Sequence, residues 1–287
     1  MSDAKSLSAF SDGLAAAVEA ASASTLLVDA RKRYPASGIA YAADLVLTAD
    51  HVVTRDEDIR VGLPDGKRVA ATVAGRDPGS DLALLRLGEK VLAPANTAKD
   101  PARVGQIVLA LGRPSEAGVQ ASFGIVTAIG GPARTARGGL LEQYLQTEAT
   151  PYPGFSGGPL INAAGEVLGL NTSGLTRGAA LTIPVGVAWV IADSLEKHGT
   201  VKRGYLGVRT QPVETGLLVL WLEKDGPAEK GGLLVGDILT KVNNQSLHDA
   251  DDLFAALTSE TVGKKTDVDI LRGGQPQTLK VTVGERK

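Results

Sequence analysis

Short apolar runs separated by glycine recur between residues 39 and 190. Runs of this kind lie at 104–111, 124–129 and 167–170. They predict short buried strands, because β-branched side chains pack well on a pleated sheet and glycine permits tight turns. No regular alternation of strands with long helices accompanies them, so a parallel α/β sheet is not expected. The first two thirds of the chain should fold mainly as β-structure.

One serine stands among three glycines in residues 154–160, which have the sequence Gly-Phe-Ser-Gly-Gly-Pro-Leu. Glycine has no Cβ, so Gly154 and Gly157 can adopt backbone angles closed to other residues and turn N–H groups towards the Ser156 hydroxyl. Acyl transfer needs an activated hydroxyl and preorganised donors for the carbonyl oxygen, and this loop can supply both. The alternative is an ordinary turn, in which Gly, Ser and Pro are common.

A serine nucleophile needs a base, and the chain holds three histidines, at positions 51, 198 and 248. His51 follows the apolar run 45–49, which predicts a strand. His198 precedes a glycine at the end of a helical pattern, as expected of a C-terminal cap, and His248 lies in an acidic turn. His51 is therefore the candidate base, with a structural histidine as the alternative.

The remaining group of a serine triad is a carboxylate that fixes the imidazole tautomer. Asp81 opens the run Asp-Leu-Ala-Leu-Leu-Arg-Leu, whose apolar residues predict a buried strand. Asp77 is the competitor, but Pro-Gly-Ser follows it, so a turn residue at the surface is expected there. Asp81 is therefore the candidate.

The candidates occur in the order His, Asp, Ser, which is the order of chymotrypsin-like double β-barrels. Subtilisins and α/β-hydrolases use other orders. Pro159 and a strand-like segment follow Ser156, whereas the nucleophile elbow of α/β-hydrolases leads into a long helix. The sequence predicts a mainly β, chymotrypsin-like double β-barrel.

Four segments resemble the HtrA (Deg) serine proteases, which join a trypsin-like protease domain to one or more PDZ domains. In chain order they contain Thr-Ala-Asp-His-Val-Val (48–53), Ser-Asp-Leu-Ala-Leu-Leu (80–85), Phe-Gly-Ile-Val-Thr (123–127) and Gly-Phe-Ser-Gly-Gly-Pro (154–159). The resemblance covers nearly the whole chain. It implies a triad of His51, Asp81 and Ser156, with backbone N–H groups of Gly154 and Ser156 forming the oxyanion hole.

Three positions near the serine depart from the family's usual residues. Phe155 stands where asparagine is usual, Glu148 where aspartate is usual, and Tyr152 where asparagine is common. A bulky ring at position 155 is expected to alter how the oxyanion loop packs. The alternative function, a catalytically weak or latent protein-binding module or holdase, depends mainly on this residue.

Thr150 stands six positions before Ser156, where trypsin-like enzymes with a basic preference carry an acidic residue. A substrate Arg or Lys would lack a partner in such a pocket, so small or medium apolar side chains are expected. Leu170, Asn171 and Thr172 are expected to form the strand on which an extended substrate pairs.

A short polar stretch bracketed by glycines suggests a boundary near residue 200. We predict a trypsin-like protease domain at 1–198, a linker at 199–204 and an α+β PDZ domain at 205–285. The resemblance assigns the PDZ carboxylate-binding loop to Tyr205, Leu206, Gly207 and Val208. Residues 217–222 are expected to pair with the bound peptide and 249–257 to form an amphipathic helix. The alternative is a domain used only for packing or assembly.

Composition narrows the partners and cofactors. Zero cysteines exclude disulfides and thiolate chemistry, and the separated histidines show no metal-ligand spacing, so no cofactor is expected. The net charge is −2 with both signs spread along the chain, so neither nucleic acid nor a membrane is expected as a partner. The expected partners are unfolded proteins and peptides, and the resemblance implies a homo-oligomer, commonly a trimer.

Residues 1–30 make a poor signal peptide, because Asp3, Asp12, Glu19 and Asp29 interrupt their apolar stretches. Their longest uncharged segment is also too short for a membrane span, which needs about 20 apolar residues. A helix at 14–21 and a first strand at 25–28 are expected instead. Cytoplasmic residence is the resulting prediction, with export of a longer precursor left open.

The resemblance implies an ATP-independent serine endopeptidase that hydrolyses unfolded or damaged proteins. Ser156 is expected to attack the carbonyl, His51 to carry the proton and Asp81 to orient the imidazole.

Overall fold

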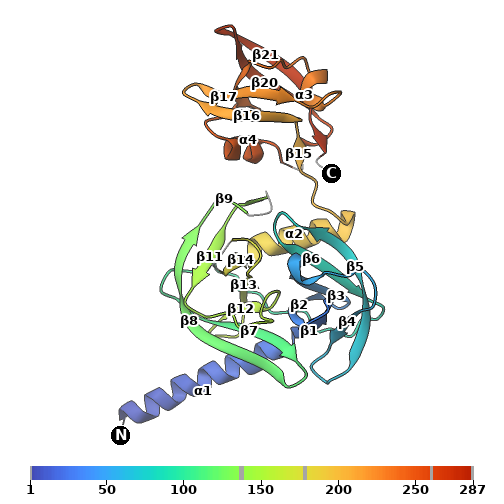
Figure 1. Ribbon diagram of the computed structural model, residues 1–287. Helices are drawn as coiled ribbons and strands as arrows, with labels where there is room; N and C mark the ends of the chain where they lie inside the picture. The colour runs from blue at the N-terminus through green and yellow to red at the C-terminus, as the bar shows by residue number, and fades with distance from the viewer. Residues whose placement is uncertain (1, 136–138, 177–179, 259–260, 286–287) are drawn as a thin grey trace. The chain divides into compact units, whose positions relative to one another are not determined.

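The computed structural model describes residues 2–135, 139–176, 180–258 and 261–285 (Figure 1). The chain divides into two compact units, Met1–Thr200 and Val201–Lys287. The first unit holds the triad candidates and the second holds the expected PDZ segments.

The first unit contains two closed antiparallel barrels. The first barrel has the strand order β1-β2-β3-β6-β5-β4. Its strands are β1 (Thr25–Asp29), β2 (Ala36–Ala42), β3 (Leu45–Ala49), β4 (Ile59–Gly62), β5 (Arg68–Asp77) and β6 (Leu82–Leu87). Leu26, Val46 and Leu85 are among the fully buried aliphatic side chains of its core. Apolar residues on short strands therefore fill the barrel interior, as the sequence pattern predicts.

The second barrel has the order β11-β14-β13-β12-β7-β8. Its strands are β7 (Ile107–Ser115), β8 (Gly118–Gly130), β11 (Tyr144–Thr147), β12 (Pro159–Asn162), β13 (Val167–Thr172) and β14 (Leu181–Pro184). A short hairpin of β9 (Ala133–Arg134) and β10 (Leu140–Leu141) lies beside it. The predicted mainly β double barrel is confirmed.

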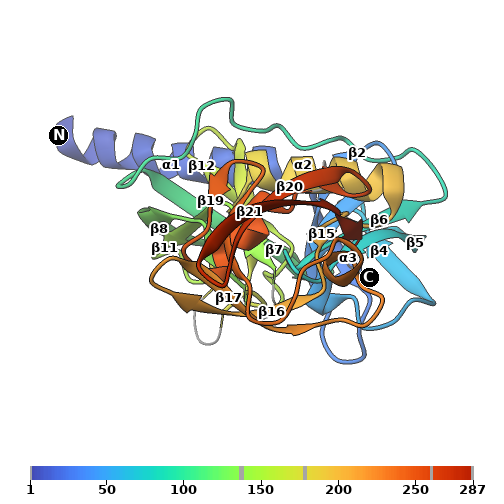
Figure 2. The same cartoon turned by 90° about the horizontal axis from the view of Figure 1, so that it is seen from above.

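Two helices complete the first unit. Helix α1 (Ser2–Ser22) begins well before the expected residue 14, and only its last turns pack on the barrels, through buried Ala17 and Ala21 (Figure 2). Helix α2 (Val185–His198) packs on strands of both barrels and ends at Gly199, which has φ +73°. None of the helices in the described residues is long and apolar enough to cross a bilayer.

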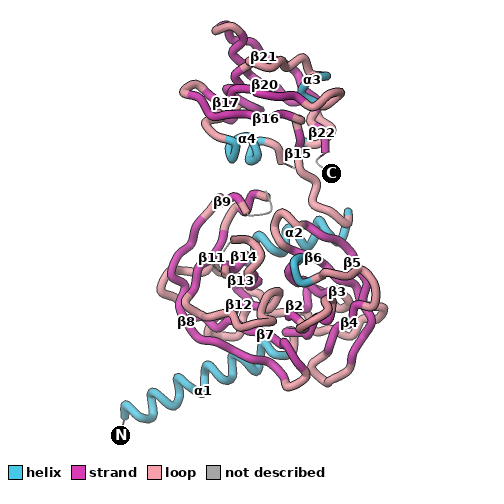
Figure 3. The backbone as a smooth tube through the Cα atoms, viewed as in Figure 1, coloured by secondary structure: helices cyan, strands magenta, loops and turns pink. Residues whose placement is uncertain are grey.

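The second unit is a small α+β fold (Figure 3). Its main sheet has the order β16-β17-β18-β20-β21. Those strands are β16 (Val208–Val213), β17 (Gly216–Leu222), β18 (Ile238–Val242), β20 (Lys265–Arg272) and β21 (Gln275–Thr282). The shorter elements are β15 (Gly204–Tyr205), α3 (Pro227–Lys230), β19 (Gln245–Ser246), α4 (Ala250–Ala256) and β22 (Gly284–Glu285).

Both ends of the expected linker 199–204 are bonded within a unit. The Arg76 N–H donates to the Gly199 carbonyl at 3.0 Å, which attaches this end of the stretch to β5. Gly204 pairs with Glu285 in the second unit. We therefore propose that residues 201–203 form the connection.

Candidate active site

Strands β3 and β6 bring His51 and Asp81 together. The two strands are paired, with Ala49 opposite Leu82. His51 lies in a 3-10 turn (Asp50–Val52) directly after β3, and Asp81 directly precedes β6. The His51 Nδ1 to Asp81 Oδ2 distance is 2.7 Å, and the His51 backbone N–H donates to Asp81 Oδ1 at 2.8 Å. The Asp81 side chain is fully buried and that of His51 is 18% exposed. The buried carboxylate therefore orients the imidazole ring, which is partly exposed to solvent.

Thr172, which the sequence predicted only as part of a substrate strand, holds the Asp81 carboxylate and is itself held by Gly174. Thr172 Oγ1 donates to Asp81 Oδ2 and in turn accepts the Gly174 N–H at 3.0 Å. Asp81 itself has φ +58°, in the left-handed region that residues other than glycine rarely adopt. The surrounding contacts therefore hold a strained backbone in place at this position.

The turn that carries His51 is clamped by Arg76, another residue without a motif signal. Arg76 Nε donates to the buried Asp50 carboxylate at 2.7 Å, and its Nη2 donates to the Val53 carbonyl at 2.7 Å. These two bonds hold both ends of the turn. Asp77, the rejected triad candidate, is the last residue of β5 and its carboxylate accepts from Ser80 in the turn that follows, but it is buried and not at the surface as expected.

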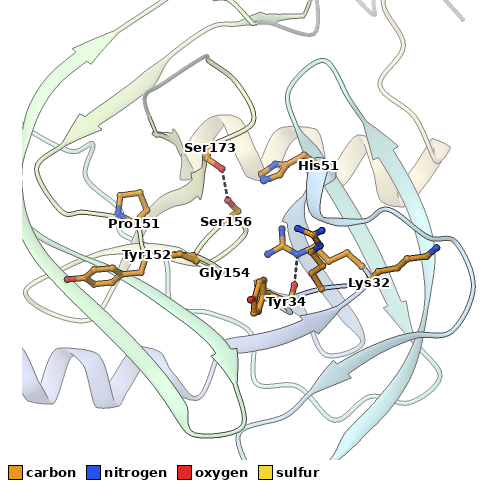
Figure 4. Close-up of a pocket in the computed structure, with 11 residues that line it drawn as sticks. Lys32, Tyr34, His51, Pro151, Tyr152, Gly154, Ser156 and Ser173 are labelled. Atoms are coloured by element: carbon orange, nitrogen blue, oxygen red, sulfur yellow. Dashed lines mark hydrogen bonds between the residues drawn. The ribbon is translucent and has the colours of Figure 1, made fainter.

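Ser156 faces the same cleft as His51 (Figure 4). Its Oγ lies 3.2 Å from Ser173 Oγ, and among the described residues no hydrogen bond joins it to His51. Catalytic hydrogen bonds are often long or misaligned without substrate.

The loop around Ser156 presents unengaged donors. Gly154 has φ +90° and Gly157 has φ +87°, as the sequence analysis expected of glycines there. Within the described residues, the N–H groups of Gly154 and Ser156 donate to no protein acceptor. Ser37 fixes the loop from the first barrel, because its Oγ donates to the Gly154 carbonyl at 2.7 Å and its N–H to the Ser156 carbonyl at 3.1 Å.

Phe155 points away from the cleft. Its side chain is fully buried in the core of the second barrel, with Leu145 and Leu160. The Tyr152 ring meets it edge-on at 5.5 Å between centroids. Phe155 anchors the loop in this core, and its effect on the oxyanion hole stays a prediction.

The expected substrate strand is not an open edge. Strand β13 lies between β12 and β14, so Leu170 pairs with both Pro159 and Ile183. Asn171 and Thr172 are also buried. The prediction that residues 170–172 pair with the substrate was therefore wrong, and β13 ends at Thr172.

Thr150 is exposed, and its carbonyl accepts a hydrogen bond from Ser122 at 2.6 Å. It is not among the residues that line the cleft. That cleft has a volume of about 600 Å³ and is lined by Arg31, Lys32, Arg33, Tyr34, His51, Pro151, Tyr152, Pro153, Gly154, Ser156 and Ser173.

In the second unit, β16 and β21 are the two edge strands of the main sheet. Strand β17, which contains the expected pairing residues 217–222, lies between β16 and β18, so that prediction was wrong. Helix α4 packs near β16, and Asp249 caps it by accepting from the N–H groups of Asp251 and Asp252. The β16 edge next to α4 is therefore the part of this unit to which a peptide strand could be added.

The expected carboxylate-binding loop leads into this edge strand. Leu206 is buried, Gly207 has φ +76°, and Tyr205 and Val208 are half-buried. In the part of the chain that the structure describes, the Leu206 and Gly207 N–H groups have no protein acceptor. Two adjacent free donors suit a peptide carboxylate.

Comparisons with known proteins agree with this architecture. Residues 36–170 match the trypsin-like peptidase domain family, and residues 204–283 match the PDZ domain family. The solved structure of the HtrA-type protease AlgW with a tripeptide is 31% identical, with a TM-score of 0.80, over 96% of this chain and 97% of that one. The chain belongs to the HtrA protease family. A serine endoprotease from Yersinia pestis is similarly related, with 30% identity, a TM-score of 0.82, and coverage of 94% of this chain and 97% of that one.

Curated relatives of this HtrA family member are longer than the chain. A probable periplasmic serine endoprotease, DegP-like, from Ectopseudomonas mendocina is 37% identical over 267 residues, 86% of this chain but 56% of the relative. One of the same name from Halomonas elongata is 34% identical over 274 residues, 88% of this chain and 57% of the relative. The chain thus spans a little over half their length.

The names of these relatives overturn the predicted cytoplasmic location, because they are periplasmic proteins. The prediction took the charges in residues 1–30 as a sign of compartment. Asp12 and Glu19 are instead exposed residues of α1. These charges reflect the local fold, and they do not determine the compartment.

Proposed function

We propose that this protein is a serine endopeptidase that hydrolyses peptide bonds in unfolded or damaged proteins. The observation that carries the proposal is the buried Asp81 carboxylate bonded to His51 Nδ1, in one cleft with the Ser156 hydroxyl. The naming of relatives as serine endoproteases supports it.

In the proposed reaction, Ser156 Oγ attacks the substrate carbonyl while His51 Nε2 takes its proton. Asp81 keeps the Nδ1–H oriented and stabilises the imidazolium. The N–H groups of Gly154 and Ser156 donate to the developing oxyanion. The imidazolium then gives its proton to the leaving amine, and water hydrolyses the acyl-enzyme by the same route.

We retain two finer proposals about the substrate. Thr150 does not line the cleft, but the described residues that line it include no Asp or Glu, which favours small or medium apolar side chains before the cleaved bond. The edge of β16, together with the loop at 205–208, is proposed to bind peptide segments or C-termini. Self-association, with a trimer as the family's usual form, stays a prediction for light scattering to measure.

Digestion of unfolded β-casein tests the proposal. The wild type should cleave it, mostly after small apolar residues, and Ser156→Ala should reduce turnover by about four orders of magnitude or more. Ser173→Ala is the matched control, since it removes a neighbouring hydroxyl that the mechanism does not use. Equal cleavage by the wild type and Ser156→Ala would exclude Ser156 as the nucleophile.

The holdase alternative makes the opposite prediction. Folded wild-type protein would then leave casein intact while still binding it. The buried position of Phe155 removes the main reason for preferring that alternative.

A further inference from the structure

A cluster of cations borders the catalytic cleft. Arg31, Lys32, Arg33 and Tyr34 connect β1 to β2, and we call them the basic loop. All four line the cleft that contains His51 and Ser156 (Figure 4). Lys32, Arg33 and Tyr34 are exposed, so their side chains are accessible to a bound substrate.

The charges of the basic loop lack partners. Among the described residues, no carboxylate forms an ion pair with Arg31, Lys32 or Arg33. Elsewhere in the first barrel the arginines are paired with Asp or Glu, as seen for Arg55, Arg60, Arg68, Arg76 and Arg86. Unneutralised cations beside a cleft raise the local concentration of anionic ligands.

The basic loop is fixed relative to the oxyanion loop. Arg31 is half-buried, and its guanidinium donates to the Tyr34 carbonyl and, at 3.3 Å, to the Pro35 carbonyl. Pro35 O lies 3.1 Å from the place a Cβ would take at Gly154. Arg31 therefore shapes the loop, and Lys32 and Arg33 remain for recognition.

The position of the loop indicates which part of a peptide it meets. A peptide attacked by Ser156 directs its carbonyl oxygen to the donors at Gly154 and Ser156. The acyl part can pair only beyond Thr172, near Ser173, because β13 is already paired on both sides. Figure 4 shows Ser173 and Tyr34 on opposite sides of Ser156, so the leaving part runs towards the basic loop.

We infer that the basic loop selects substrates with acidic side chains shortly after the cleaved bond, through Lys32 and Arg33. This specificity rests on the proposed peptidase function. It adds a second determinant, on the leaving-group side, to the apolar preference before the bond.

Two quenched fluorescent peptides test the inference with the full chain. They are identical except for Asp-Glu or Asn-Gln at the second and third positions after the cleaved bond. The wild type should hydrolyse the acidic peptide with about tenfold higher kcat/KM at low salt, and the ratio should fall as salt screens the charges.

The double variant Lys32→Glu with Arg33→Glu should abolish or invert that ratio. The matched control is Lys99→Glu with Arg103→Glu, which reverses two exposed charges outside the cleft and should keep the wild-type ratio. Persistence of the acidic preference in the Lys32 and Arg33 variant would contradict the inference.

Failure of the inference differs from failure of the proposed function. Equal wild-type rates on both peptides would overturn the inference alone. If neither peptide is cleaved, their affinities for the full chain, measured by fluorescence anisotropy, decide: tighter binding of the acidic peptide supports recognition by the basic loop, and equal binding contradicts it.

Discussion

At the scale of single residues, Gly174 leaves just enough room for the His51–Asp81 pair. A Cβ at position 174 would lie 2.6 Å from His51 Nδ1 and would also clash with Asp81 Oδ2. The pair must then shift, so Gly174→Ala should lower kcat by about 100-fold. Steady-state kinetics on casein-derived peptides measures this. Gly186→Ala, where an added Cβ meets nothing within 4 Å, is the control, and an unaffected kcat in Gly174→Ala would show that the pair tolerates the methyl group.

Phe155 supports the oxyanion loop from within the barrel core. Removing its fully buried ring in Phe155→Ala should cost about 3–5 kcal/mol of unfolding free energy. Urea unfolding followed by circular dichroism measures the loss, with Phe155→Leu as the milder comparison. A loss below about 1 kcal/mol would mean that the ring does not hold the loop.

The candidate triad could be predicted because each member stands in a short motif. The residues that hold it could not. Thr172 contacts Asp81 across a separation of 91 residues, and Ser37 contacts Gly154 across 117. No local pattern reports contacts between segments so far apart in the chain.

At the scale of elements, strand existence was predictable from the sequence but strand neighbours were not. Residues 208–213 and 217–222 both form strands, yet only β16 has a free edge, because β17 also pairs with β18. The same reason explains β13, which the serine motif suggested as a substrate strand. Edge position depends on which distant strands pair, and apolar alternation alone does not encode it.

Glu223 adds a negative charge next to the loop that leads into β16. A Cβ at Gly207 would lie 3.1 Å from Glu223 Oε2, which places this carboxylate near the free N–H groups. Like charges repel, so Glu223→Gln should tighten binding of a peptide C-terminal carboxylate by about threefold to tenfold. Isothermal titration of a free-acid peptide and its C-terminal amide tests this. Unchanged affinity for the free acid would place the carboxylate elsewhere.

At the scale of the whole molecule, the second unit should respond to acid through one buried ion pair. In the second unit, the buried Asp237 accepts from Arg272 Nε at 2.8 Å and from Nη2 at 2.7 Å. Burial alone would raise the pKa of Asp237, but the bonds from Arg272 and the Leu234 N–H outweigh it and hold the pKa below its ordinary value.

A lowered pKa in the fold stabilises it above the unfolded-state value of about 3.9, and this contribution is lost as pH falls through the folded value. The second unit should therefore lose stability below about pH 4. The Asp237→Asn variant should be less stable than the wild type at neutral pH, and its unfolding free energy should change less as the pH falls. Urea unfolding of Trp189→Phe, which leaves Trp221 as the fluorescent reporter, measures it. If the unfolding free energy depends on pH with the same slope in the wild type and in Asp237→Asn, the Asp237–Arg272 pair does not cause the loss of stability in acid.

The double barrel followed from the chain order of the triad, which few folds share. The compartment could not be predicted in the same way, because the residues that form α1 and β1 reflect how this segment folds and do not determine whether the protein is exported. The cytoplasmic prediction failed for that reason.

The central claim is that Ser156 is a nucleophile activated by His51. Reaction of the folded chain with a fluorophosphonate probe, followed by peptide mapping, tests it most directly. We expect one modified residue, Ser156, and loss of labelling in His51→Ala. Absence of labelling in well-folded wild type, or equal labelling without His51, would contradict it.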